Sequence, residues 1–194
     1  MQEALSIYRD QLEKAKSALI NIQSEAEAAS EHRTEQQALV ERIEIAKPLF
    51  SLHRDSMMRH PVISFTIANR GSVPVRRIFV EGTLQTPGRA VAWVKDTFNY
   101  EFPGGLEPNE TQYLNLEPNM FSDWGKVPET AVDGSLLTLR LTSFEDAAGN
   151  RYGEDDSGNR DSERLANRKK ALEDAIRELE TKIGDLEKQL QQEL

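Results

Sequence analysis

Residues 2–46 contain neither glycine nor proline, and this feature restricts the start of the chain to one long helix. The segment is rich in Ala, Glu, Gln and Leu, and Pro48 is expected to end it. Apolar residues recur with a period of 3.5, which predicts a coiled-coil seam that is weak between Ala26 and Gln36. One seam position holds Leu5, Leu12, Leu19, Ala26, Arg33 and Val40, and the other holds Tyr8, Ala15, Ile22, Ala29, Gln36 and Ile43.

Residues 162–194 repeat this pattern more regularly and predict a second helix. Its seam residues, which alternate at steps of four and three, are Leu172, Ile176, Leu179, Ile183, Leu186 and Leu190. Asp161 or Ser162 is expected to cap the helix at its start. Glu173, Glu180 and Glu187 flank the seam, and their like charges disfavour a parallel dimer of this helix with itself.

The middle of the chain, residues 60–152, has a different character because it holds 7 of the 8 prolines and most of the aromatic residues. Apolar or alternating segments at 62–68, 75–84, 97–102, 112–116 and 136–144 are strand candidates. Turn signals such as Asn69-Arg70-Gly71 and Asp133-Gly134 separate them. Short strands at this spacing predict an antiparallel β-sandwich.

The predicted fold is α+β, with an antiparallel Ig-like β-sandwich inserted between two long helices that form an antiparallel coiled-coil hairpin. Neither helix can bury its apolar stripe on a small sandwich, and in this pairing Arg9, Lys14, Lys16 and Arg42 meet the Glu residues of the second helix. The expected segments are a helix at 1–47, a linker at 48–59, the sandwich at 60–152, an acidic linker at 153–161 and a helix at 162–194. A dimeric or trimeric bundle, with helices pairing between chains, is the alternative.

Composition excludes several classes of function. The chain carries 33 Asp and Glu against 24 Lys and Arg, a net charge of −9, which argues against non-specific nucleic-acid binding. The absence of cysteine excludes disulfides, thiolate metal sites and a cysteine nucleophile. No apolar run approaches the about 20 residues that a membrane-spanning helix needs, and no signal peptide is recognised in this numbering.

Two phrases resemble those of Ig-like modules in bacterial envelope proteins: the strand, turn and return strand of residues 63–75, and Gly105-Leu106-Glu107-Pro108-Asn109-Glu110-Thr111, where Asn109 stands in place of the usual glycine. Residues 82–126 resemble a family of small bacterial lipoproteins of unknown function. The matching groups are Gly82-Thr83-Leu84, Pro87-Gly88-Arg89, Trp93-Val94, Phe98-Asn99-Tyr100, Pro103-Gly104-Gly105-Leu106 and the run 118–126. The resemblance implies an envelope location with an acylated N-terminus, although this sequence has no lipid-acceptor cysteine.

No catalytic, cofactor or metal site is predicted. His32, His53 and His60 fall in the first helix, the linker and the first strand without metal-ligand spacing, and no Ser–His–Asp arrangement is recognisable. The acidic segment 144–156 offers oxygen ligands of the kind that Ca²⁺ prefers, but it lacks the ligand ladder of an EF-hand. We expect an ordinary hairpin from Asp146 to Tyr152 there, followed by an acidic linker.

The candidate binding residues are Arg89, Trp93, Tyr100, Phe121 and Trp124. Phe98, Tyr100 and Phe102 alternate and should line one face of a sheet, whereas both tryptophans lie in turn-rich stretches. Core or loop-anchoring packing is the favoured interpretation of these aromatic residues, and a surface for a partner is the alternative.

The sequence favours a non-enzymatic, periplasmic or envelope-anchored protein whose helical stalk presents an Ig-like head for scaffolding or protein interaction. The expected partner is a protein, with no nucleic acid involved, and a homodimer through the helices stays open. Two other hypotheses remain: a small-ligand or glycan-binding module that uses the Trp93 and Trp124 loops, and a cytosolic coiled-coil adaptor.

Overall fold

A computed structural model describes residues 2–54, 58–154 and 156–192. The fold is α+β, and the chain divides into two compact units. The helical unit comprises the described residues up to Thr34 and from Asp156 onward, and the sheet unit comprises the described residues of Glu35–Glu154. The helical unit therefore draws its two helices from opposite ends of the chain.

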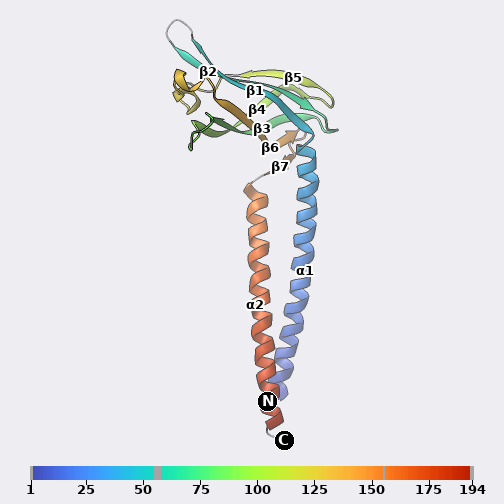
Figure 1. Ribbon diagram of the computed structural model, residues 1–194. Helices are drawn as coiled ribbons and strands as arrows, with labels where there is room; N and C mark the ends of the chain where they lie inside the picture. Colours follow the sequence, from blue (N-terminus) through green and yellow to red (C-terminus); the bar gives the residue numbers. More distant parts are fainter. Residues whose placement is uncertain (1, 55–57, 155, 193–194) are drawn as a thin grey trace. The chain divides into compact units, whose positions relative to one another are not determined.

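The helical unit is built from α1 (Gln2–Val40), up to Thr34, and α2 (Asp156–Gln192), which run side by side in opposite directions (Figure 1). The apolar seams predicted from the sequence lie between them: Ile22, Ile176 and Ile183 are buried. Arg33, at a seam position, is exposed, and its Nε donates to the carbonyl oxygen of Ala29 on its own helix. No helix among the described residues is long and apolar enough to cross a membrane.

Two ion pairs show the register in which the two helices pair. Arg9 contacts Glu187 at 2.7 Å and Lys16 contacts Glu180 at 3.2 Å. Seven residues forward on α1 correspond to seven residues back on α2, so both pairs belong to one antiparallel register. The prediction that Arg9 and Lys16 meet glutamates of the second helix is confirmed. Each pair is exposed and contributes at most about 1 kcal/mol, so burial of the seam supplies most of the stability.

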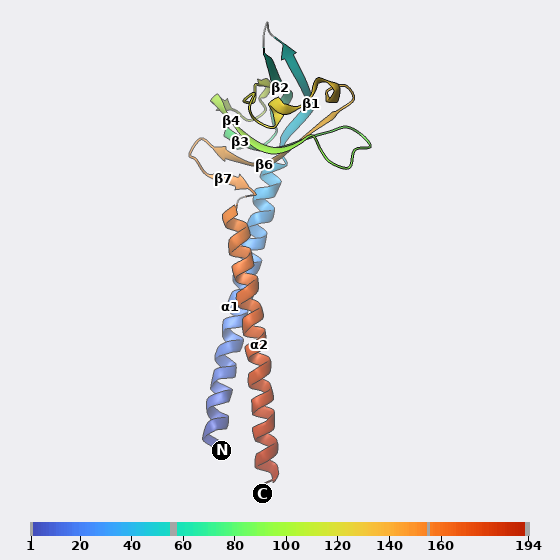
Figure 2. The same cartoon turned by 90° about the vertical axis from the view of Figure 1, so that its left-hand side faces the viewer.

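The sheet unit contains two antiparallel sheets. The first has the strand order β1 (Ile43–Arg54), β2 (Arg59–Asn69) and β5 (Thr111–Leu116). The second has the order β4 (Val94–Leu106), β3 (Val75–Gln85), β6 (Leu136–Asp146) and β7 (Arg151–Gly153). Two short 3₁₀ helices, Trp124–Lys126 and Glu129–Ala131, lie between β5 and β6. All five predicted strand regions are confirmed, and Figure 2 shows the long β1–β2 hairpin beside the second sheet.

The first predicted boundary is wrong, because α1 ends at Val40 and residues 43–54 form β1. Ile43 fits the heptad, but Ile43 and Ile45 also alternate as in a strand, and Ile43 is buried in the sheet core opposite Asn69. The predicted linker at 48–59 is largely the β1–β2 hairpin, with residues 55–57 outside the described part. Pro48 is tolerated because it lies at a bulge of an edge strand, where Lys47 has a φ of 54°.

The second boundary also differs, because α2 begins at Asp156, within the predicted linker 153–161. Asp161 and Ser162 therefore lie inside the helix and cannot cap its start. The helix also includes Gly158, and a single glycine costs a helix only about 1 kcal/mol. Gly153, the other end of that linker, belongs to β7, while Asp155 lies outside the described residues.

One hydrophobic core joins the two sheets. Alternate residues of each strand face inward, and the central strands contribute fully buried Phe65, Ile67, Ile78 and Leu84. A row of this kind arises because side chains alternate between faces along a strand. The two sheets are thus the layers of a sandwich-like unit, which is not closed into a barrel.

The turn between β4 and β5 explains the asparagine that replaces a glycine in the sequence phrase. Asn109 has a φ of 66°, a backbone conformation that glycine and asparagine tolerate best. Its N–H donates to the carbonyl of Asn69 at 2.7 Å, and the N–H of Asn69 donates to the carbonyl of Glu110 at 3.0 Å. Two residues thus face one, which is the pattern of a bulge at the start of β5.

Candidate functional site

A concave feature of the sheet unit arises from a difference in width between the two sheets. The first sheet has three strands and the second has four, and β1 packs nearest β6, on the side away from β4. The inner face of β4 is therefore only partly covered: Phe98 and Tyr100 point inward yet stay half-buried, whereas Phe102 is buried. The predicted alternation of these three aromatic residues is confirmed.

A cleft of about 520 Å³ lies along this uncovered face, between the edge strands β4 and β5. It is lined by Ile63, Asp96, Phe98, Asn99, Tyr100, Asn115, Leu116, Glu117, Pro118, Asn119, Ser122 and Trp124. Two of these residues are acidic, and none of the described lining residues is Lys, Arg or His. The cleft therefore combines an aromatic floor with amides and carboxylates, a lining suited to neutral or cationic groups.

Hydrogen bonds hold several polar groups of the cleft in place. Asn115 Oδ1 accepts from Ser64 Oγ at 2.7 Å, and Asn119 Oδ1 accepts from the Phe121 N–H at 2.8 Å. Asp96 accepts from its neighbour's backbone, Thr97 N–H, at 2.8 Å through Oδ1. These contacts fix the side-chain oxygens of the two asparagines.

Trp124, one of the predicted binding residues, is part of the core. It is 2% exposed, its ring centroid lies 5.8 Å from that of Phe50, and its Nε1 donates to Asp96 Oδ2 at 3.2 Å. A Cβ atom on Gly82 would lie 2.9 Å from Trp124 Cζ2, so glycine is needed opposite the ring. Trp124 closes one end of the cleft and has no free face on which a ligand could stack.

Arg89 and Trp93 form a separate pair in the loop between β3 and β4. The Arg89 guanidinium carbon lies 3.5 Å from the centre of the Trp93 ring, and Trp93 Nε1 donates to Thr86 Oγ1 at 2.9 Å. Cation–π contact of this kind covers the ring face. Neither residue lines the cleft, so the structure does not bring the five predicted residues together.

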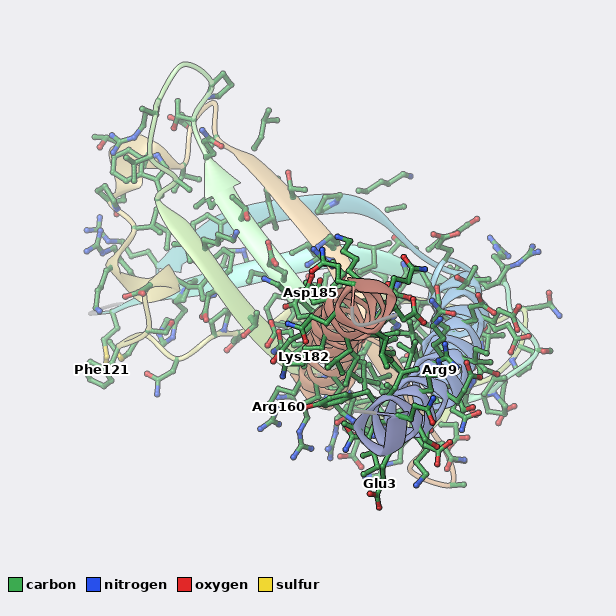
Figure 3. All side chains as sticks on the ribbon, turned by 90° about the horizontal axis from the view of Figure 1, so that it is seen from below. Glu3, Arg9, Phe121, Arg160, Lys182 and Asp185 are labelled. Atoms are coloured by element: carbon green, nitrogen blue, oxygen red, sulfur yellow. The ribbon has the colours of Figure 1, made fainter. Side chains whose placement is uncertain are left out.

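Phe121 is 78% exposed and lies in the loop that follows β5. In Figure 3 its side chain points away from the strands into solvent. Its neighbours Asn119 and Ser122 line the cleft, which places Phe121 at the rim. Of the predicted residues, Tyr100 and Trp124 thus line the cleft and Phe121 lies beside it. Asn115, Asn119 and Glu117 were missed, because no motif distinguishes them from ordinary strand-end residues.

The outer face of the second sheet carries a network of ion pairs. Arg77 bonds Glu101 and also contacts Glu145 at 3.5 Å, while Arg140 contacts Glu81 at 3.0 Å. The hydrogen bond from Arg77 lowers the pKa of Glu101, and that from Arg140 lowers the pKa of Glu81. The ion pairs therefore keep these carboxylates charged on the outer face of the sheet, where they contact water and their arginine partners.

The acidic segment after β6 forms the predicted hairpin. Asp146 accepts hydrogen bonds from the Asn150 N–H, from Asn150 Nδ2 and from the Tyr152 hydroxyl at 2.8, 2.8 and 3.0 Å. Tyr152 stacks on Phe144 with ring centroids 4.9 Å apart. The Asp146 carboxylate is therefore occupied by the turn itself, and the prediction of a hairpin from Asp146 to Tyr152 is confirmed.

Stability should depend on the ionisation of Asp146. Hydrogen bonds from Asn150 lower the Asp146 pKa below its ordinary 3.8, so its charged form stabilises the fold above that pH and the contribution is lost as pH falls through the folded value. Asp146→Asn is expected to cost about 1 kcal/mol at pH 7 and progressively less as the pH falls below 3.8. Urea unfolding over a series of pH values measures this, with exposed Asp133→Asn as the control. A loss that stays constant over the whole acid series would contradict it.

The histidines lie apart from the cleft. His32 is in α1, while His53 and His60 face each other across β1 and β2. His53 is thus in a strand, where a linker was predicted. Among the described residues no group of three His, Asp or Glu side chains could hold a metal ion.

No protein-family model matches the chain, and no curated protein matches it. Among solved structures, the chain is similar to the structural genomics target SoR45, at 11% identity over 59% of this chain and 81% of that chain, with a TM-score of 0.32. It is also similar to the trimeric lipoprotein SadB of Salmonella enterica, at 13% identity over 79% of this chain and 85% of that chain, with a TM-score of 0.31. Likenesses this distant identify neither a function nor an assembly.

Proposed function

We propose that this chain is a non-enzymatic binding protein of the cell envelope, and that the β4–β5 cleft contacts a protein partner. The uncovered inner face of β4 carries this proposal. Phe98 and Tyr100 occupy core-facing positions in the middle of a strand, yet they stay half-buried because the narrower sheet does not reach them. Aromatic side chains in such positions gain most from burial, so a partner that covers them stabilises the complex.

The finer architecture in this proposal is an Ig-like sandwich together with an antiparallel coiled-coil hairpin. The strand order supports the Ig-like sandwich. The chain passes from one antiparallel sheet to the other after β2, after β4 and after β5, and Ig-like domains also connect their two sheets by such crossings. The heptad seams of α1 and α2, with the pairs Arg9–Glu187 and Lys16–Glu180, support the coiled-coil hairpin.

The envelope location is supported by the resemblance of residues 82–126 to small bacterial lipoproteins. Two of the matching residues meet in the structure, because the ring of Trp124 lies against Gly82, where a Cβ atom would be 2.9 Å from Trp124 Cζ2. A small residue is therefore needed at position 82.

A second candidate ligand is a neutral glycan. It is favoured by Asn99, Asn115 and Asn119, whose amides line the cleft beside Tyr100, because sugars are bound by amide and carboxylate groups next to an aromatic ring. A glycan site built on Trp93 and Trp124 is not supported, since one ring is covered by Arg89 and the other is buried.

Selection of short peptides on the full chain, alongside a glycan array, tests the proposal. We expect soluble peptides to bind, and Tyr100→Thr to weaken that binding at least about tenfold by fluorescence anisotropy. The control is Leu136→Thr, which removes an exposed apolar side chain at the start of β6 and should change the affinity less than about twofold.

The same experiment can overturn the proposal. If no peptide binds, or if binding survives Tyr100→Thr in a variant that unfolds at the wild-type urea concentration, the cleft is not a site for a protein partner. Glycan binding that is lost in Tyr100→Thr would replace the protein partner with the second candidate.

A further inference from the structure

The strand β5 forms an open edge of the three-stranded sheet, beside the cleft. It reads Thr111-Gln112-Tyr113-Leu114-Asn115-Leu116, without a charge, a proline or a glycine. Its pairing with β2 runs without a shift along all six residues. Open edges of this kind are templates for another strand, and natural proteins usually block them.

The other described edges carry such blocks. In β1 a bulge with Lys47 and Pro48 interrupts the pairing. In β4, Pro103 lacks an N–H, and charged residues such as Lys95 and Glu101 lie along the strand. The strand β7 has only 3 residues. Among the described strands, β5 is thus the edge that lacks each of these devices.

The hydrogen-bond pattern shows which backbone groups of β5 are open. Asn69 N–H donates to the Glu110 carbonyl just before the strand begins, so the bonded pairs that follow are those of Gln112, Leu114 and Leu116 with β2. Bonded and non-bonded pairs alternate in an antiparallel ladder. The N–H and C=O groups of Thr111, Tyr113 and Asn115 therefore point away from β2, toward the open edge.

A strand added at this edge would also cover the half-buried aromatic residues Phe98 and Tyr100 of β4. It would become the fourth strand of the narrower sheet and would lie over the part of the inner face of β4 that the first sheet does not cover. Its inward side chains would contact Phe98 and Tyr100. Because strands pair about 4.8 Å apart and sheets pack about 10 Å apart, one added strand spans the missing position.

We propose that β5 binds an extended segment of a partner protein by strand addition. This inference rests on the proposed protein-binding function and specifies its mode. The segment runs antiparallel to β5, as all strand pairs of this unit do, and places apolar residues over Phe98 and Tyr100. It carries a basic residue beside Asp96 or Glu117, because the described lining of the cleft is acidic and holds no base.

Proline at Tyr113 tests the backbone contact. Tyr113→Pro removes an N–H that points to the open edge and leaves the ladder to β2 intact, whereas Tyr113→Thr removes the same side chain and keeps the N–H. With a selected peptide of 6 residues, the length of β5, as the probe, we expect Tyr113→Pro to weaken binding at least about tenfold and Tyr113→Thr less than about threefold. Equal loss in both variants would make the contact a side-chain one and overturn strand addition.

A second measurement does not depend on the folding of a proline variant. Copies of the peptide methylated on the backbone nitrogen of single residues should lose binding at every second position, because a strand offers alternate N–H groups to its neighbour. Replacing the peptide's basic residue by Glu should weaken binding as well. Loss at consecutive positions, or at none, would overturn strand addition while leaving a peptide-binding cleft in place; failure of every peptide to bind would overturn the proposed function itself.

The occupant could also be a second copy of the chain, paired edge to edge through β5. Sedimentation equilibrium of the full chain without peptide distinguishes this outcome. A monomer supports the partner segment, whereas a dimer that Tyr113→Pro dissociates would assign the edge to self-association and overturn the proposal.

Discussion

Trp124→Ala is expected to lower the free energy of unfolding by about 3–5 kcal/mol, the largest single loss that we predict. The substitution empties a site that is closed by Phe50 and Gly82, and it leaves Asp96 Oδ2 without its indole donor. Neither neighbour can move in to fill the space, because one is held in β1 and the other has no side chain.

Urea unfolding followed by circular dichroism measures this loss. Phe121→Ala is the matched control, because Phe121 is an aromatic residue of the same loop but is 78% exposed. It should change the free energy of unfolding by less than about 0.5 kcal/mol. If the two variants lost similar amounts, Trp124 would not be the anchor of the loop between β5 and β6.

Asn69→Ala is expected to cost about 3 kcal/mol. Asn69 is fully buried, and its side chain donates to the carbonyls of Val73 and Leu106 and accepts from the N–H of Gly71. Alanine leaves these three backbone groups without their partner inside the protein. The neighbouring turn between β2 and β3 and the end of β4 then lose their common attachment.

Asn69→Asp separates the hydrogen bonds from the shape of the side chain. The carboxylate has nearly the same shape, but it cannot donate, so at neutral pH it faces two carbonyl oxygens. We expect a loss at least as large as for alanine at pH 7, smaller at about pH 4, where protonation restores one donor. Thermal unfolding at both pH values provides the measurement, and exposed Asn99→Ala is the control. Wild-type stability of Asn69→Asp at pH 7 would contradict the role of the donors.

The elements that could be predicted from sequence are those whose apolar residues repeat with a spacing that fits either a strand or a helix, but not both. The alternation at 75–84 suits a strand only, and the steps of four and three from Leu172 to Leu190 suit a helix only. Ile43 suits both patterns, because it continues the heptad and also alternates with Ile45, and the long helical run before it made the helix prediction wrong. The pairing of Ile43 with Asn69 and of Ile45 with Ile67 in β2, which lie more than 20 residues further along the chain, determines the outcome.

The candidate site was less predictable because it depends on contacts between distant segments. Trp124 is buried because Phe50 and Gly82, which are distant in the sequence, pack against its ring. The residues next to Trp124 in the sequence do not predict these contacts. The open face at Phe98 and Tyr100 exists because the two sheets differ in width. Sequence patterns give strands, but the number of strands in each sheet follows from their pairing, which loops and bulges such as that at Asn109 control.

The pairing of Arg9 with Glu187 has a consequence for the order of folding. These residues are separated by nearly the whole chain, and closing a flexible loop of that length costs about 3 kcal/mol more than closing a short turn. The sheet unit removes this cost once it has folded, because it brings its own ends together: a Cβ on Gly153 would lie 2.7 Å from Val40 Cγ2. We therefore expect residues 35–154 to fold first and the two helices to pair afterwards, when the folded sheet unit has shortened the flexible loop that their pairing must close.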